Sequence, residues 1–300
     1  MAFDADSLGI SRASTRLLRD LIHERLGLYF DDARFDQLAD RLAPVLVQRG
    51  FGSLLDYYYL LKYDAEADAE WPRVMDALAV NETYFWREID QIRAVADVVL
   101  PQCLEAASGQ PLQIWSVPCA TGEEPLTIAM VLEEGGWFAR APIRIIGSDA
   151  SPAAIHKARR GLYRTRSFRN LPESLRERYF QKDGDEWRID DAIHRRITWD
   201  LVNLQNPADV ARWGASPIVF CRNVFIYFSE TSIRRTLDLF AGCMPPRGYL
   251  CIGASESLLR ITTSFELQEI GGAFMYVRRA SRDETPATTA PARGTARWND

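Results

Sequence analysis

The feature that most constrains the fold of this chain is an alternation of short apolar runs with helical stretches, which begins near residue 91. Turn residues bound the runs, and sequence with helical spacing separates them. Strands that alternate with helices in this way predict an α/β fold with a doubly wound, mainly parallel sheet. The predicted parallel strands lie at 113–117, 143–147, 217–221 and 249–253, and an antiparallel strand at 274–277 is expected to close the sheet.

The sequence before this alternation has a different periodicity, which we interpret as a small all-helical domain over residues 1–78. Apolar residues recur there at helical spacing, and no alternating strand pattern appears. One stripe is formed by Leu17, Leu18, Leu21, Ile22 and Leu26, and a second by Phe35, Leu38, Leu42, Val45 and Leu46. Residues 79–90 are then expected to link this domain to a second domain at 91–280.

Over about residues 162–200 the alternation is interrupted, and the sequence predicts a small antiparallel β insertion. Its segments are expected at 178–180, 187–189 and 196–199, with a turn at 183–185. Residues 281–300 are rich in Thr, Pro and Ala. Such a composition cannot bury enough apolar surface to offset the entropy lost on ordering, so we expect a disordered tail.

The composition is that of an ordinary globular protein, and it argues against several classes of function. Hydrophobic residues make up 47% and charged residues 26% of the 300 positions. No apolar run has the length of a membrane span, and the first residues lack the pattern of a signal peptide. We therefore expect a cytoplasmic protein without direct membrane insertion. The net charge of -5 argues against a nucleic-acid binder, and the scattered cysteines and histidines predict no metal site.

Polar residues follow the predicted strands where each strand ends, and in a parallel sheet these ends meet at the edge that binds ligands. The loop at 119–125 leads from a strand into a helix and contains a single glycine, so it is no dinucleotide-binding fingerprint. Its small residues still allow the backbone to approach a ligand closely. Glu123 and Glu124 at the helix start either stabilise the helix dipole or bind a cationic ligand, and both interpretations stay open.

Asp149 ends the next predicted strand. An acidic residue at that place can accept hydrogen bonds from the hydroxyls of a ribose. The alternative is that it caps the following helix, but Ser151 already fits the N-cap position, with Pro152 at the first helical position. We therefore favour the ribose role for Asp149.

Two further polar clusters have both a structural and a functional interpretation. Arg222, Asn223 and Tyr227 follow the predicted strand at 217–221, where they lie either at a ligand pocket or in a salt-bridged loop beside a core tyrosine. The linker carries Asn81, Thr83 and Arg87 around three aromatic residues at 84–86. This segment either faces a cofactor or is a polar connection held by a buried aromatic plug.

Three sequence motifs, taken together, identify a protein family more specifically than any one of them does alone. They are Asn-Glu-Thr-Tyr-Phe-Trp-Arg-Glu at 81–88, Cys-Ala-Thr-Gly-Glu-Glu-Pro at 119–125 and Cys-Arg-Asn-Val-Phe-Ile-Tyr-Phe at 221–228. In order and spacing they resemble the chemotaxis receptor methyltransferases, the CheR-type enzymes that esterify glutamate side chains. The resemblance runs from about Leu8 to Val277. It implies a sheet of the class I methyltransferase type, S-adenosylmethionine as cofactor and S-adenosylhomocysteine as product.

The resemblance also implies roles for individual residues. Those implied to bind the cofactor are Asn81, Thr83, Arg87, Glu123, Asp149, Asn203, Leu204, Arg222 and Asn223. Arg87 and Tyr227 are the implied catalytic residues, placed to orient the substrate carboxylate. Asn203 and Leu204 follow a strand-like run at 197–202 and are chosen on the resemblance alone, because an asparagine there otherwise forms a turn.

The implied partner is the helical cytoplasmic domain of a chemoreceptor, which a monomeric enzyme docks through the second N-terminal helix. Arg34 and Arg41 lie in that region. A second basic stretch at 157–169 includes Arg164 and Arg166 and is either a solvated face or a docking surface for an acidic helix.

Family members that add a receptor tether as a strand to the insertion carry a longer glycine-containing loop than the connection at 181–186 here. Strand addition needs an open edge with side-chain pockets beside it, and a tight hairpin supplies less of both. The sequence therefore predicts recognition that is independent of a C-terminal receptor pentapeptide.

The expected chemistry needs few catalytic groups. A glutamate side chain, with a pKa of about 4.3, is already ionised at neutral pH, so no general base and no metal are required. The enzyme then aligns and partly desolvates the reactants. Protein-glutamate O-methylation is our first hypothesis. A methyltransferase with another acceptor and a non-catalytic protein that retains the pocket are the alternatives, although the intact Arg87, Arg222 and Tyr227 count against lost activity.

Overall fold

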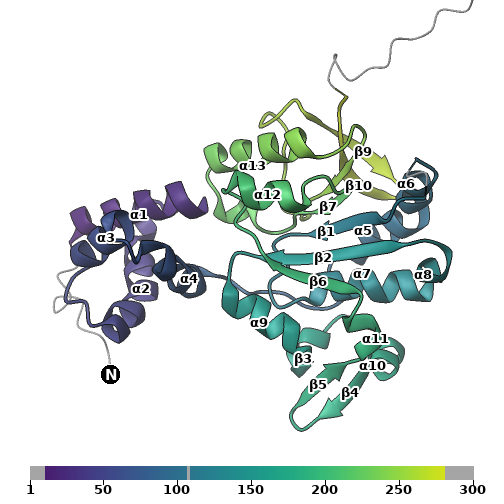
Figure 1. Ribbon diagram of the computed structural model, residues 1–300, viewed down its shortest axis with the longest axis horizontal. Coiled ribbons are helices and arrows are strands. Elements are labelled where there is room, and N and C mark those ends of the chain that lie inside the picture. The colour runs from purple at the N-terminus through teal and green to yellow at the C-terminus, as the bar shows by residue number, and fades with distance from the viewer. Residues whose placement is uncertain (1–10, 107–108, 281–300) are drawn as a thin grey trace, which may run out of the picture.

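A four-helix domain forms the N-terminal part of the computed structural model, which describes residues 11–106 and 109–280 (Figure 1). The predicted disordered tail at 281–300 lies outside the described residues. The helices are α1 (Arg12–Leu26), α2 (Phe35–Arg49), α3 (Leu54–Tyr63) and α4 (Ala67–Leu78), with the 3-10 turn η2 (Asp32–Arg34) before α2. They pack around a buried core that contains Leu18, Ile22, Leu42, Leu46, Tyr57 and Val74. Both apolar stripes are confirmed except at Leu17, which is 43% exposed.

A seven-stranded sheet forms the core of the second domain, in the order β6-β2-β1-β7-β8-β10-β9. The strands are β1 (Leu112–Ser116), β2 (Ile143–Asp149), β6 (Ile197–Leu201), β7 (Ile218–Phe220), β8 (Tyr249–Cys251), β9 (Phe265–Ile270) and β10 (Ala273–Arg278). The first five strands pair in parallel, and β10 runs antiparallel between β8 and β9. The predicted sheet and its antiparallel closing strand are therefore confirmed.

Helices cover both faces of this sheet because neighbouring residues of its buried strands face opposite sides. Ile114 of β1 packs in the core beneath the helices that precede and follow that strand, whereas Trp115 packs in the core beneath the later helices. The first set consists of α5 (Ile89–Ala94), the π-helical turn η3 (Val95–Val99), α6 (Leu100–Ala106), α7 (Glu123–Glu134) and α8 (Trp137–Arg140). The second set contains α12 (Pro207–Trp213) and α13 (Glu230–Cys243), and α9 (Pro152–Arg160) packs on β2 and β6.

The predicted insertion is a three-stranded antiparallel sheet in the order β3-β5-β4. Its elements are β3 (Leu162–Tyr163), the 3-10 turn η4 (Thr165–Phe168), α10 (Glu173–Tyr179), β4 (Phe180–Asp183), β5 (Glu186–Ile189) and α11 (Asp191–His194). One part of the prediction was wrong. The segment at 196–199 belongs to β6 of the main sheet, because it pairs in parallel with β2 rather than with the insertion.

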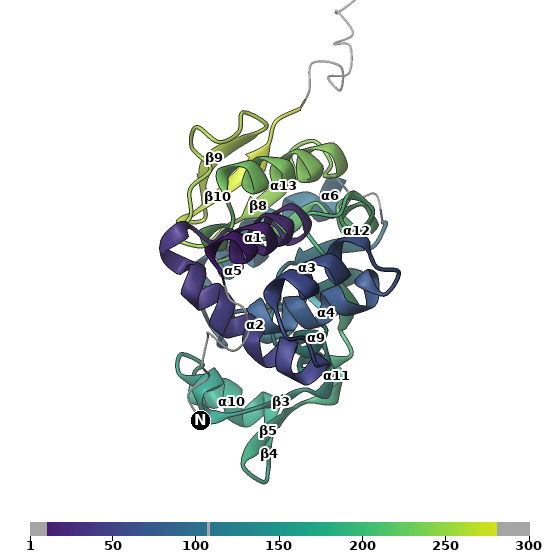
Figure 2. The ribbon, with the colours of Figure 1, turned by 90° about the vertical axis from the view of Figure 1, so that its left-hand side faces the viewer.

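The helical domain lies against the edge of the main sheet where the parallel strands end (Figures 1 and 2). Hydrogen bonds join the two domains at several points. Asp76 of α4 accepts hydrogen bonds from the Ser151 hydroxyl (2.6 Å) and the Ala153 amide (3.1 Å) at the start of α9. The Tyr29 amide donates to the Tyr227 carbonyl at 2.8 Å. None of the helices in the described residues has the length and apolar character that a membrane crossing requires. The domain boundaries at 79–90 stay a prediction.

Candidate functional site

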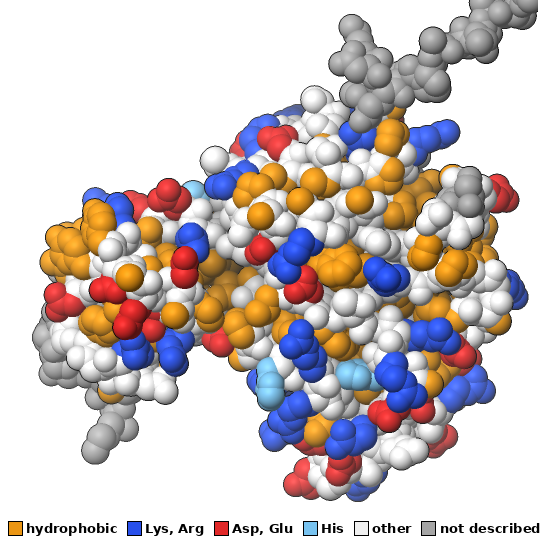
Figure 3. All heavy atoms as spheres, viewed as in Figure 1, with side chains coloured by type: hydrophobic (Ala, Val, Ile, Leu, Met, Phe, Trp, Pro, Cys, Tyr) orange, Lys and Arg blue, Asp and Glu red, His pale blue; other side chains and the backbone are white. Residues whose placement is uncertain are grey.

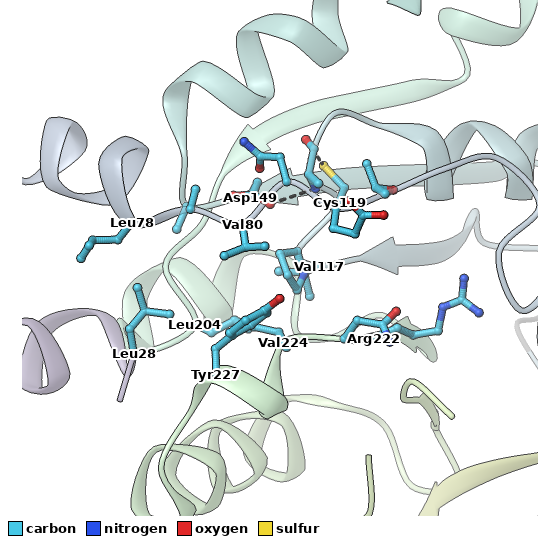
Figure 4. Close-up of a pocket in the computed structure, with 18 of the residues that line it drawn as sticks. Leu28, Leu78, Val80, Val117, Cys119, Asp149, Leu204, Arg222, Val224 and Tyr227 are labelled. Carbon is cyan, nitrogen blue, oxygen red and sulfur yellow. Dashed lines mark hydrogen bonds between the residues drawn. The ribbon is translucent and has the colours of Figure 1, made fainter. Parts of the chain in front are cut away.

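A pocket lies between the helical domain and the carboxyl ends of the parallel strands (Figure 4). It collects most of the residues that the sequence predicted. Those that line it are Asn81, Thr83, Arg87, Asp149, Asn203, Leu204, Arg222, Asn223 and Tyr227, together with Arg34 and Arg41 from the helical domain. Three predicted residues, Glu123, Arg164 and Arg166, line a neighbouring pocket instead.

Asp149 fixes the loop after β1 and faces the pocket. One carboxylate oxygen accepts the Ala120 amide at 2.9 Å, and the other accepts the Ser151 amide at 2.9 Å. Ala120 has a φ of 47° and Gly122 a φ of 97°, so the loop turns sharply and brings its backbone close to the pocket. Burial raises the pKa of the Asp149 carboxyl above its ordinary value, although both amide hydrogen bonds act to lower it.

The walls around Asp149 fit an adenosyl group. Val80, Val117, Leu204 and Val224 present apolar surface to the pocket, as a flat heteroaromatic ring requires (Figure 4). Asp149 is 6% exposed, and each of its carboxylate oxygens accepts one backbone amide, which leaves capacity for the hydroxyls of a ribose. The combination of a buried acceptor and apolar walls matches the cofactor that the sequence implied.

The linker reaches this pocket because an aromatic residue anchors it. Phe85 is fully buried against Tyr163 (4.8 Å between ring centroids), Phe168 (5.4 Å) and Phe180 (5.0 Å). These rings belong to the insertion, so the insertion holds the linker against the sheet. The residues around the anchor, including Asn81, Thr83 and Arg87, stay at the surface of the pocket.

Arg222 is buried and its guanidinium is fully engaged. It donates to the Glu124 carboxylate at 2.6 Å and to the carbonyl oxygens of Arg87 (2.9 Å) and Glu88 (3.1 Å). Figure 4 shows its side chain pointing away from the centre of the pocket. The predicted cofactor residue therefore holds the linker, and its own contribution to the pocket comes from the near end of the side chain and its backbone.

The linker segment whose carbonyls Arg222 binds has a strained backbone. Trp86 has a φ of 69° and Glu88 a φ of 48°, a region that costs a non-glycine residue about 1–3 kcal/mol unless its surroundings enforce it. Of the two carbonyls that Arg222 binds, one belongs to Glu88 itself and the other to Arg87, which lies between the two strained residues. Glu124 orients the guanidinium and is itself held by the Ser116 hydroxyl at 2.7 Å.

The segment after β7 is shaped by a second carboxylate, the half-buried Glu256. Glu256 accepts the backbone amides of Asn223 (2.8 Å), Phe225 (2.7 Å) and Gly253 (2.7 Å). Burial raises the pKa of Glu256, while these hydrogen bonds act to lower it. The arrangement holds Asn223 at a φ of 60°, and it carries the turn that leads to Tyr227.

Tyr227 and Arg87 line the same pocket. The Tyr227 hydroxyl points into the pocket and makes no hydrogen bond with another described residue (Figure 4). Arg87 donates to the Glu82 carbonyl at 3.0 Å and lies over the Tyr84 ring, 5.5 Å from its centroid. Its ion pair with Glu88 is long, at 3.8 Å, so the guanidinium retains donors that can meet a carboxylate.

Asn203 connects the domains with its side chain. Its amide nitrogen donates to the Arg25 carbonyl of α1 at 2.8 Å, and its amide oxygen accepts the Gln205 amide at 2.9 Å. Leu204 beside it is buried and supplies apolar pocket wall. The predicted pair therefore meets the pocket mainly through Leu204 and the Asn203 backbone.

Glu123 lies apart from Asp149 and Arg222, in the neighbouring pocket, whose lining it shares with Asn81 and Thr83. It is 2% exposed and accepts hydrogen bonds from the hydroxyls of Thr121 (2.6 Å) and Ser167 (3.0 Å). Burial raises its pKa above the ordinary value, although these hydrogen bonds act to lower it. The sequence offered Glu124 only as a possible partner of a cationic ligand, and it did not identify Glu256. A buried arginine after an apolar strand was the one signal for Glu124, because such an arginine needs a carboxylate partner.

The four predicted docking arginines occupy two different places. Arg34 and Arg41 line the pocket at the strand ends from the helical domain and donate to the carbonyls of Tyr29 (3.0 Å) and Leu78 (2.8 Å). Arg164 and Arg166 line the neighbouring pocket on the insertion side. No group of three or more metal-binding side chains is found in the described part of the chain.

Comparison with known proteins agrees with this geometry. The model of the CheR methyltransferase all-alpha domain matches residues 13–79, and that of the CheR methyltransferase SAM binding domain matches residues 81–273. "Chemotaxis protein methyltransferase 2" of Vibrio cholerae is 35% identical over 87% of this chain and 91% of that protein. "Chemotaxis protein methyltransferase 1" of Pseudomonas aeruginosa is 29% identical over 90% of this chain and 99% of that protein.

A relative whose name refers to biofilm formation is also similar. "Probable biofilm formation methyltransferase WspC" of Pseudomonas putida is 31% identical over 90% of this chain and 63% of that protein. Together the two family models cover the helical domain, the linker and nearly all of the α/β domain. The chain therefore belongs to the CheR methyltransferase family, and its cofactor is S-adenosylmethionine.

Proposed function

We propose that this protein transfers a methyl group from S-adenosylmethionine to glutamate side chains in the cytoplasmic helical domain of a chemoreceptor. The observation that carries the proposal is the position of Arg87 and Tyr227, which line the same pocket as Asp149. An arginine and a neutral hydroxyl are suited to orient a carboxylate. The relatives named chemotaxis protein methyltransferases support a receptor as the substrate.

Each pocket residue then has a stated task. Asp149 binds the ribose hydroxyls, while Leu204 and the other apolar walls hold the adenine ring. Asn81, Thr83 and Asn223 supply polar contacts at the rim. Arg222 holds the linker in place from behind. When bound, S-adenosylmethionine supplies a methyl group on positively charged sulfur.

The acceptor carboxylate needs orientation rather than activation. It is ionised at neutral pH, because its ordinary pKa is about 4.3. Tyr227 orients it with a neutral donor, which preserves its nucleophilicity better than a second cation would. Arg87 fixes the other side of the carboxylate, and the apolar walls exclude water that would solvate it.

We further propose that receptor recognition is independent of a C-terminal receptor pentapeptide. The β4–β5 connection is a tight hairpin in which Asp183 pairs directly with Glu186, which leaves little room for a specificity pocket beside the strand edge. The substrate is instead engaged by Arg34 and Arg41 on the helical domain and by the basic stretch at 157–169. Titration with an aromatic-ended receptor pentapeptide tests this, and saturable micromolar binding to the insertion would contradict it.

The proposed activity is tested with radiolabelled S-adenosylmethionine and membranes that contain chemoreceptors. Label should enter the receptor and be released by mild alkali, because a methyl ester is alkali-labile whereas an N-methyl group is not. Stable label would indicate another acceptor. Cofactor binding without any label in the receptor would indicate a non-catalytic protein or a different substrate.

A further inference from the structure

A second pocket lies next to the cofactor pocket, on the other side of the linker. Its walls come from the end of α9, from β3 and η4 of the insertion, and from the start of α7. Asn81 and Thr83 line both pockets. These two linker residues therefore form a wall that the second pocket shares with the pocket of the proposed methyl-transfer site.

The second pocket carries more positive than negative charge. Lys157, Arg160, Arg164 and Arg166 line it, against the carboxylates of Glu123 and Glu186. Glu186 is shared by Arg160 (3.7 Å) and Arg164 (3.2 Å). Lys157 and Arg166 form no ion pair with any other described residue. Lys and Arg side chains also gather over α9 and the insertion on the face that Figure 3 shows.

Helix stabilisation accounts for only part of this charge. Lys157 and Arg160 lie in the last turn of α9, where positive side chains interact favourably with the helix dipole. Arg166 lies beyond that helix, in η4. The hydroxyls of Thr121 and Ser167 are occupied by Glu123, so the unpaired cations are the groups available to a ligand.

The geometry points to a binding site for a second carboxylate of the protein substrate, on an acidic side chain close to the glutamate that is methylated. This inference rests on the proposed function and adds a specificity determinant to it. Lys157 and Arg166 bind the second carboxylate while Arg87 and Tyr227 orient the first across the linker. A carboxylate fits because it is the anion that an acidic receptor helix presents, and because adjacent pockets demand two charges on one short segment.

The test is a double-mutant cycle between enzyme and substrate. A receptor cytoplasmic fragment is methylated, the modified glutamate is located by mass spectrometry, and each Asp or Glu within four positions is changed to its amide. With the wild-type enzyme, one of these changes should lower kcat/KM by about three- to tenfold, the range for losing a partly exposed charged contact. In the double variant Lys157→Met/Arg166→Met the same substrate change should have no further effect on kcat/KM, whereas Arg166→Lys should keep the effect seen with the wild-type enzyme.

Two controls distinguish substrate recognition from a general loss of surface charge and from a change in cofactor binding. Lys182→Met removes an exposed cation of β4 outside the pocket and should leave the substrate effect intact. Affinity for S-adenosylhomocysteine, measured by calorimetry, should be unchanged in Arg166→Met. A loss of that affinity would assign the pocket to the cofactor and overturn the inference. If the free-energy losses from the enzyme change and the substrate change are additive, the two groups do not interact. That result would also overturn the inference, but it would leave the proposed function standing. A receptor that is not methylated at all would overturn both.

Discussion

The Asp149 carboxylate holds the loop after β1 and also lines the pocket that is proposed to bind the cofactor. We expect Asp149→Ala to weaken S-adenosylhomocysteine binding by about 1–3 kcal/mol, the range for loss of a buried hydrogen-bond partner. Calorimetry measures this directly, and Asp149→Asn, which keeps one acceptor oxygen, should lose less. An unchanged affinity in the alanine variant would exclude contact with the ribose.

The raised pKa of Asp149 gives cofactor binding a pH dependence with a defined sign. Because burial raises its pKa, Asp149 takes up a proton at a higher pH than an ordinary aspartate does. The protonated group is a poorer acceptor, so affinity should be highest above this pKa and fall as the pH drops through it. Calorimetry over a pH series checks this, with Asp149→Asn as the control that should lack the dependence.

Arg87 and Tyr227 should affect turnover more than cofactor binding. We expect Arg87→Ala and Tyr227→Phe to lower kcat, because each is proposed to orient the acceptor carboxylate rather than to bind the adenosyl group. Steady-state kinetics and calorimetry on the same variants separate the two effects. A preserved kcat at saturation, with kcat/KM and cofactor affinity reduced equally, would instead indicate uniform binding.

At the scale of elements, the position of the linker depends on the ion pair between Arg222 and Glu124. Glu124→Gln leaves the Arg222 guanidinium buried without its nearest counter-charge, and we expect this to lower the free energy of unfolding by about 3 kcal/mol. Amide hydrogen exchange should also accelerate at 84–90, because Arg222 no longer fixes the two carbonyls. Glu133→Gln, an exposed change on the same helix, is the matched control. A stability loss with unchanged exchange in the linker would limit Glu124 to a role in the fold.

Elements with a strong periodicity were predictable, and those defined by their partners were not. β2 and β7 are apolar runs that any buried strand requires. β9 escaped prediction because its apolar alternation ends after Phe265 and Leu267, and most of its residues are exposed at the edge of the sheet. The segment at 196–199 was assigned to the insertion because nothing in its residues records that it pairs with β2.

The same limit applies to the site. Asp149 and Arg222 could be located from sequence because the carboxyl ends of parallel strands converge. Glu123 and Glu124 could not be distinguished, since neighbouring helix residues point about 100° apart and the position of Arg222 decides which of them meets it. The contact of Asn203 with Arg25 spans 178 positions, so no local pattern contains it.

At the scale of the whole molecule, the helical domain provides a hydrogen-bond acceptor for the N-terminus of a helix in the second domain. Asp76 of α4 binds the first turn of α9, so we expect Asp76→Ala to destabilise the protein by about 1–2 kcal/mol, as loss of a helix cap does. Urea unfolding measures the change. Asp40→Ala removes an exposed acid on α2 and should have little effect. Equal stability of the two variants would show that the interdomain cap contributes nothing.

The cofactor pocket takes its walls from both domains, and Leu28 and Phe228 form a bridge between them. Occupancy of the pocket and the arrangement of the domains are therefore thermodynamically linked. Under the proposed function, a receptor that docks on the helical domain and favours the domain arrangement that forms the pocket raises affinity for the methyl donor, and the donor then raises affinity for the receptor by the same factor. If the proposed receptor substrate is correct, the supply of the methyl donor sets how firmly the enzyme is retained on that receptor.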